Sequence, residues 1–134
     1  MKKGVTLVEI LVAVVIFVTT IIAILMSFIN CVFLNQLNRE HVRATTHAQY
    51  VLEEINEANT NVAVIGGLIL GGGWDWNTAN IVAIPELSAL DSENIATDAT
   101  WDVAGELLNV TVTVNWDDLR GRPSNVVLRS LFAG

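Results

Sequence analysis

The chain has 134 residues and a mass of 14.6 kDa, which limits it to one globular domain at most. Hydrophobic residues make up 52% of it and the mean hydropathy is +0.52, which is high for a soluble domain. The formal charge of −7 makes the chain a poor general binder of nucleic acid, because phosphates are bound by clustered lysine and arginine side chains.

The first predicted element is a long apolar helix. Val5–Leu34 contains a single charged side chain, Glu9. As a helix these thirty residues span about 45 Å, more than the ~30 Å hydrocarbon core of a bilayer. The run is too long for a secretory signal peptide, and no A-x-A-like cleavage site follows it. Because Lys2 and Lys3 precede it, we expect a membrane span with a cytoplasmic N-terminus and an exported C-terminal part.

The helix is predicted to continue past the apolar run with an amphipathic pattern. No glycine or proline interrupts residues 5–58, and the sequence NEANTN at 56–61 is typical of a helix end. Residues of the expected buried stripe recur at spacings of three and four. This stripe consists of Leu34, Leu37, His41, Ala44, Ala48, Val51 and Ile55. We therefore expect one helix over residues 5–58, with 5–34 embedded in the membrane or in a filament core.

Residues 59–134 are predicted to form a β-rich globular part. Its strongest strand is Leu108–Trp116, in which apolar and polar side chains alternate. Turn residues at 117–123 connect it to a partner strand, Asn125–Phe132. The hairpin has one apolar face, and the amphipathic half of the helix is the only good candidate to cover it. Weaker segments with β-type composition, each interrupted, short or ambiguous, are Val62–Leu70, Ile81–Ile84, Ile95–Ala99 and Thr100–Ala104.

The start of the apolar run carries the most specific motif. The basic leader, residues 1–4, ends in Gly4, and Val5-Thr6-Leu7-Val8-Glu9 follows. This arrangement resembles the class III signal of type IV pilins and pseudopilins. The resemblance implies that a prepilin peptidase cuts between Gly4 and Val5 and methylates the new amine of Val5. It also implies an α+β, pilin-like fold, in which a long N-terminal helix packs on a small antiparallel sheet.

Glu9 also has a physical rationale of its own. A carboxylate within an apolar run is costly unless it is paired. Cleavage would create a positive amine on Val5, about one helical turn away, and the resemblance implies that this amine pairs with Glu9 of the same or a neighbouring chain. Alternatively, Glu9 lies near the lipid headgroups, because it is only about 6 Å past Val5 along the helix axis.

Other features favour a minor subunit over a major pilin. Many major pilins have proline at the position of Met26 and a C-terminal cysteine pair, whereas Cys31 is the sole cysteine here. The stretch NVTVTVNWDDLRGRPSNVVLRSLFA is similar to the last hairpin of minor pilins and type II secretion pseudopilins of the pilus-modification type. The resemblance thus implies a structural subunit of a type IV pilus or of a type II secretion pseudopilus.

The resemblance also implies partners and a location. The partners are other pilin or pseudopilin subunits, the prepilin peptidase and an assembly platform in the inner membrane. The subunit resides in the bacterial inner membrane before assembly, and in a periplasmic or extracellular filament afterwards. One alternative is an uncleaved membrane-anchored binding module that uses Trp74 and Trp76. Another is a DNA-uptake pilin, whose local basic site would comprise Arg120, Arg122 and Arg129.

No catalytic or metal constellation stands out. No set of nucleophile, base and orienting group is recognisable, so we expect no enzyme, no cofactor and no metal. His41 and His47 are six residues apart and point in different directions on a helix; His41 is expected to pack on the buried stripe. One group of acids offers ligands for calcium, but solvated surface is the favoured interpretation. The group consists of Asp91, Glu93, Asp98 and Asp102.

Overall fold

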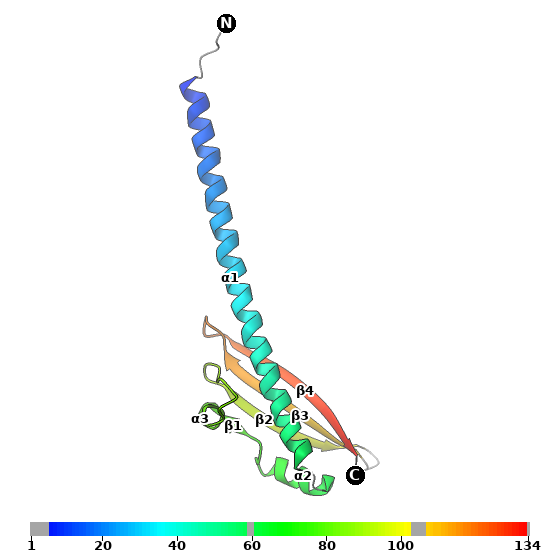
Figure 1. The fold of residues 1–134 in the computed structure, drawn as a ribbon. Helices are drawn as coiled ribbons and strands as arrows, with labels where there is room; N and C mark the ends of the chain where they lie inside the picture. The colour runs from blue at the N-terminus through cyan, green and yellow to red at the C-terminus, as the bar shows by residue number, and fades with distance from the viewer. Residues whose placement is uncertain (1–5, 59–60, 103–106, 134) are drawn as a thin grey trace. The chain divides into compact units, whose positions relative to one another are not determined.

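The structure, a computed structural model, describes residues 6–58, 61–102 and 107–133. Its longest element is the helix α1, Leu7–Glu57, shown from blue to green in Figure 1. This confirms the long helix expected over residues 5–58 apart from its ends, because Thr6 and Ala58 are not helical and Val5 lies outside the described residues. The chain divides into two compact units, residues 1–37 and 38–134, and α1 begins in the first and ends in the second.

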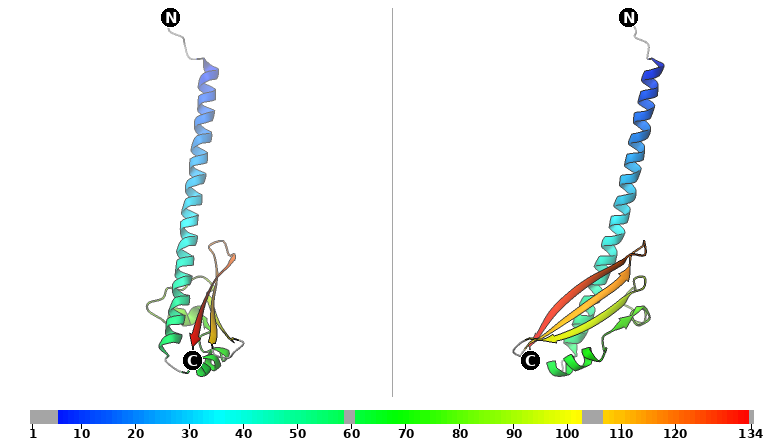
Figure 2. Two further views of the ribbon diagram at one scale, coloured as in Figure 1. Left: turned by 90° about the vertical axis from the view of Figure 1, so that its right-hand side faces the viewer. Right: turned by 180° about the vertical axis from the view of Figure 1, so that it is seen from behind.

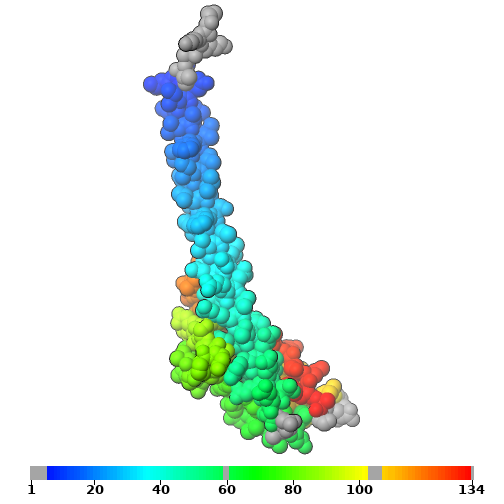
Figure 3. All heavy atoms as spheres, viewed as in Figure 1, coloured from blue at the N-terminus to red at the C-terminus, as the bar shows by residue number. Residues whose placement is uncertain are grey.

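From residue 7 to residue 37 the N-terminal unit is an apolar stretch of α1. α1 is long and apolar enough to cross a membrane, and its most apolar stretch has a mean hydropathy of 2.9 with none of its residues buried. The hydroxyls of Thr19 and Thr20 both donate to the carbonyl oxygen of Ile16, at 2.9 and 2.7 Å. These polar groups are thus satisfied within the helix itself, as a lipid or protein interior requires. Figure 3 shows the side chains of this segment on the helix surface.

The C-terminal unit is built on a four-stranded antiparallel sheet with the order β1-β2-β3-β4. Its strands are β1 (Trp76–Asn77), β2 (Asn94–Trp101), β3 (Leu107–Asp117) and β4 (Pro123–Ala133). The pairing of β3 with β4 runs without a break from Leu107↔Ala133 to Asp117↔Pro123. The predicted terminal hairpin is therefore confirmed, and with it the α+β layout of a long helix and a small antiparallel sheet.

The last turns of α1 cover the inner face of this sheet, as Figure 2 shows within the C-terminal unit. Small and branched side chains recur on the helix at Ala44, Ala48, Val51 and Ile55, and all four are fully buried. They share one core with the inward-facing residues of β3, of which four have no exposed surface. These are Leu108, Val110, Val112 and Val114. The amphipathic stripe thus marks the buried face of the helix correctly from Ala44 onward.

Two segments expected to have β-type structure are helical instead. Val62–Leu70 forms α2, which begins where the Asn61 side chain accepts a hydrogen bond from the Ala63 amide at 3.0 Å. The buried side of α2 has helical spacing, and its residues are Val62, Ile65, Gly66 and Ile69. β-branched residues are tolerated in this helix because it packs against β2, so tertiary contacts outweigh intrinsic propensity.

The second helical segment is α3, Thr78–Val82, which takes in the first half of Ile81–Ile84. Asn77 and Asn80 form a reciprocal capping box at its start, which fixes the first turn. By contrast, Ile95–Ala99 and the first two residues of Thr100–Ala104 belong to the single strand β2. Residues 103–104 lie outside the described part of the chain.

Candidate functional sites

The N-terminal end of α1 combines a helix cap with an acid in the first turn. The amide of Glu9 donates to the backbone oxygen of Thr6 at 3.0 Å and contacts the Thr6 hydroxyl oxygen at 3.4 Å. Thr6 and Glu9 have the spacing of a capping box, and a negative charge in the first turn is favourable with the helix dipole. Glu9 therefore also supports the start of the helix locally, a role that its sequence spacing from Thr6 already indicates. Gly4 and Val5 lie outside the described residues.

Glu9 stands on an otherwise apolar surface. A shallow hollow beside it is lined by Ile10, Ala13, Val14 and Phe17. Residues 6–37 contain no lysine, arginine or histidine, and Arg39 is roughly 45 Å further along the helix. A cation that pairs with Glu9 must therefore come from residues 1–5, which include Lys2 and Lys3 before any cleavage, or from another molecule.

A buried polar pair joins α1 to the segment before β2. His47 Nδ1 lies 2.6 Å from Glu93 Oε1, and the two residues are only 2% and 1% exposed. The other carboxylate oxygen of Glu93 accepts a hydrogen bond from the Leu90 amide at 2.7 Å. The expectation that Glu93 is solvated surface is thus wrong, because a carboxylate is accommodated in a core when both of its oxygens have partners. Asp91, Asp98 and Asp102 are exposed, as expected.

The β3–β4 turn is held by a second buried acid, Asp118, which is 3% exposed. Its Oδ1 accepts from the backbone amides of Arg120 and Arg122 at 2.8 and 2.9 Å, and its Oδ2 accepts from the Arg122 guanidinium at 2.9 and 2.7 Å. These hydrogen bonds, foremost those from the Arg122 side chain, hold the pKa of Asp118 below its ordinary value. Arg122 is therefore engaged in structure, which weakens the case for a nucleic-acid site on this hairpin.

Because the pKa of Asp118 is lower in the folded than in the unfolded protein, its charge stabilises the fold above the ordinary aspartate pKa. That stabilisation is lost as the pH falls through the lowered value. We expect Asp118→Asn to be less stable than the unmodified chain at neutral pH, and the difference to shrink in acid. Urea unfolding of both proteins across this pH range measures it. A difference that stays constant into acid would contradict the assignment, and Asp91→Asn provides an exposed control.

The aromatic residues proposed for a ligand site are largely used in packing. Trp74 is 8% exposed and belongs to the core, so it is not available as an exposed ligand contact. Trp76 is half-buried, with its ring 6.1 Å from that of Tyr50. His41 is exposed but places its ring edge-on to Trp116 at 5.1 Å, so the expected packing role is confirmed only as a contact at the margin of the core.

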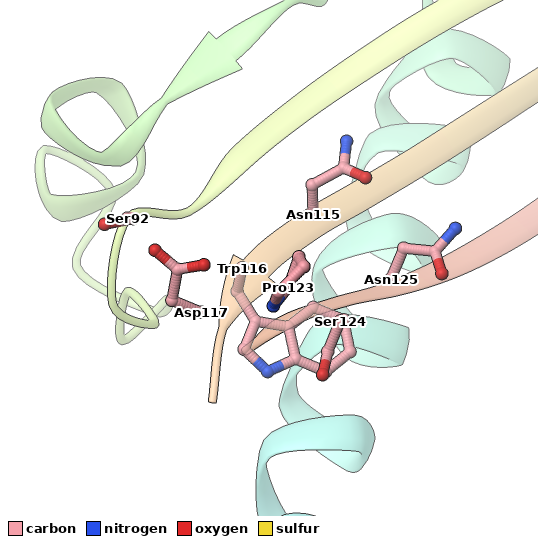
Figure 4. A pocket seen from close by; sticks show the side chains of 7 residues that line it. All are labelled: Ser92, Asn115, Trp116, Asp117, Pro123, Ser124 and Asn125. Carbon is pink, nitrogen blue, oxygen red and sulfur yellow. The ribbon is translucent and has the colours of Figure 1, made fainter. Parts of the chain in front are cut away.

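A small hollow lies at the turn end of the hairpin (Figure 4). Its volume is about 210 Å³, below the 300 Å³ or more that is typical of sites for cofactors and drug-sized ligands. It is lined by Ser92, Asn115, Trp116, Asp117, Pro123, Ser124 and Asn125. Within the described residues, no group of three or more histidine, cysteine, aspartate or glutamate side chains is placed to hold a metal ion.

Comparison with known proteins identifies no relative: no protein-family model, curated protein or solved structure matches the chain. The choice of a function therefore depends on the features of the chain itself.

Proposed function

We propose that this chain is a membrane-anchored filament subunit, a minor pilin or pseudopilin of a type IV pilus or type II secretion pseudopilus, cleaved between Gly4 and Val5. One observation carries the proposal. Glu9 is the sole charged side chain in the apolar run, it lies about one turn from the proposed cleavage site, and residues 6–37 offer it no cation. Cleavage removes Lys2 and Lys3 and creates a new N-terminal amine on Val5, which is then the nearest positive charge to Glu9 along the chain.

The exposed apolar helix fits transfer between a bilayer and a filament. Most of its large side chains are well exposed from Leu7, at 81%, to Leu34, at 59%, so the helix needs an apolar environment along this length. Lipid tails and the side chains of neighbouring helices both provide one. Such a subunit can leave the membrane for a filament core without a large change in the solvation of its apolar surface.

The amine–carboxylate pair would give the assembly its register. Within an apolar core an unpaired charge costs several kcal/mol. A subunit that docks with its helix shifted along the filament axis leaves Glu9 unpaired and is therefore disfavoured. The C-terminal unit would then lie at the filament surface, exported from the cell interior. The partners in this proposal are other pilin or pseudopilin subunits, the prepilin peptidase and the inner-membrane assembly platform, and the function is structural rather than enzymatic.

The intact mass of the protein extracted from its native membranes tests processing directly. We expect the mass of the chain without residues 1–4 plus one methyl group, because cleavage and methylation act on the same new terminus. A Gly4→Leu variant serves as the matched control, since it should keep the full-length mass and still insert through the unchanged apolar helix. Recovery of the unmodified chain with its leader intact would instead support the plain membrane anchor.

A further inference from the structure

Among the residues that the structure describes, no strand pairs with the outer edge of β4, which is a long sheet edge. β4 is the last strand of the sheet, and its pairing with β3 contains no bulge. Natural edge strands are commonly short, bulged or charged, which prevents pairing with other chains. β4 has eleven residues and a single charged side chain, Arg129, and it exposes Val127 and Leu131 at 44% and 66%. These features are typical of a strand that accepts another strand.

The register of the β3–β4 hairpin shows which backbone groups of β4 point away from β3. The Asp117 amide donates to the Asp91 oxygen, on the side of β3 away from β4, while the Asp118 amide donates to the Arg122 oxygen. In an antiparallel pair the direction alternates along the strand, so even-numbered residues of β4 bond to β3. The amides of Asn125, Val127, Arg129 and Leu131 therefore point outward. Their side chains share one face of the sheet.

The opposite edge of the sheet is occupied over the first residues of β2. There β1 pairs with the first residues of β2, at Trp76↔Ile95 and Asn77↔Asn94. Beyond that pair, the Asp75 carboxylate accepts hydrogen bonds from the amide and hydroxyl of Thr97, at 2.8 and 3.1 Å. A head-to-tail chain of identical sheets, with β4 of one copy against β2 of the next, is therefore hindered from Asn94 to Thr97, where β1 and Asp75 already occupy the edge.

Antiparallel pairing of two β4 strands is also disfavoured. Such a pairing relates the two copies by a twofold axis perpendicular to the sheet. Residue 38, where the C-terminal unit of each chain begins, then lies at opposite ends of the pair in the two copies. Two chains anchored in one bilayer through α1 instead present residue 38 on the same side; this step rests on the proposed membrane anchoring. An identical copy is thus a poor occupant of the edge.

We propose that β4 receives an extended strand from a different protein, one that alternates apolar and polar side chains and carries an acidic residue beside Arg129. The positive charge of Arg129 favours an acidic residue at the opposing position of the partner strand. Arg129 is exposed, and side chains on neighbouring strands lie about 5 Å apart. Val127 and Leu131 flank it on the same face and supply the apolar contact. The partner strand completes a five-stranded sheet through main-chain hydrogen bonds to the outward amides.

The test uses the full chain in lipid nanodiscs and a synthetic peptide that alternates threonine and valine around one central glutamate. Residue-resolved hydrogen exchange should show slower exchange at Val127, Arg129 and Leu131 when the peptide is added. Leu128 and Ser130, which already bond to β3, should be protected in both states. Val127→Pro removes one outward amide without touching the β3 ladder and should weaken binding about tenfold. Ser130→Thr lies on the other face of β4 and keeps every outward amide, so it should bind as the unmodified chain does.

Three results would overturn the inference. The first is unchanged exchange at the outward amides in the presence of the peptide. The second is equally tight binding of a peptide that carries lysine in place of the central glutamate, which would show that Arg129 does not select an acidic residue. The third is protection of the outward amides without peptide that grows with protein concentration, which would make a second copy the occupant. Peptide binding requires neither cleavage nor filament assembly, so its failure leaves the proposed function untouched.

Discussion

Replacement of Glu93 by alanine is expected to lower the free energy of unfolding of the C-terminal unit by about 3 kcal/mol. The substitution leaves His47 buried without its carboxylate partner and removes the acceptor of the Leu90 amide. Each of these losses is costly in a site with no access to water, because a polar group that loses its partner there is not rehydrated. The effect is large because Glu93 holds groups from two parts of the chain at once.

The measurement is urea unfolding of the full chain in detergent micelles, followed by tryptophan fluorescence. All four tryptophans lie between residues 74 and 116, so the signal reports on the C-terminal unit alone. Glu86→Ala is the matched control, because Glu86 is an exposed acid in the same connecting segment and its loss should change stability by less than about 0.5 kcal/mol. Equal stabilities of the two variants would show that the His47–Glu93 contact contributes nothing.

A double-mutant cycle with His47→Gln separates the pair from its surroundings. If the contact stabilises the fold, the cost of losing Glu93 should be smaller once His47 is absent. The pair joins residues that are 46 positions apart, and it fixes a segment without regular structure against α1. Loss of the pair should therefore speed hydrogen exchange at the Leu90 amide more than in β3.

The sequence predicts best those elements whose pattern repeats over many residues. α1 is predictable because the apolar run and the later stripe of buried residues have one helical phase without glycine or proline. The β3–β4 hairpin is predictable because five apolar residues alternate with polar ones before a turn. Both signals depend on local periodicity, which the folded chain preserves.

The sequence-based predictions fail for features whose structure is determined by tertiary contacts. Val62–Leu70 has β-type composition, yet its Asn61 cap and its packing against β2 make it a helix. The His47–Glu93 pair has no sequence signature, because the two residues approach only after α1 folds onto the sheet. The cap at Thr6 was recoverable from the sequence, since threonine three residues before glutamate is the pattern of a capping box.

That cap gives Glu9 two separable roles, so a single substitution cannot distinguish them. Glu9→Val removes both the charge and the side chain whose spacing from Thr6 fits a capping box. Glu9→Gln keeps a side chain able to complete the capping box but carries no charge to pair with the new N-terminal amine. Thr6→Val does the opposite, because it removes the cap hydroxyl and leaves the carboxylate in place.

We expect Glu9→Gln and Glu9→Val to insert into the membrane normally and to lower the amount of subunit in sheared filaments at least tenfold. The unpaired amine would cost several kcal/mol in an apolar core, and about 1.4 kcal/mol already corresponds to a factor of ten. Thr6→Val should weaken only the first helical turn, by about 1 kcal/mol, and should still assemble. The ratio of filament to membrane subunit, measured by immunoblot, reports all three variants. If Glu9→Gln assembles while Thr6→Val does not, Glu9 is a helix cap and the charge sets no register.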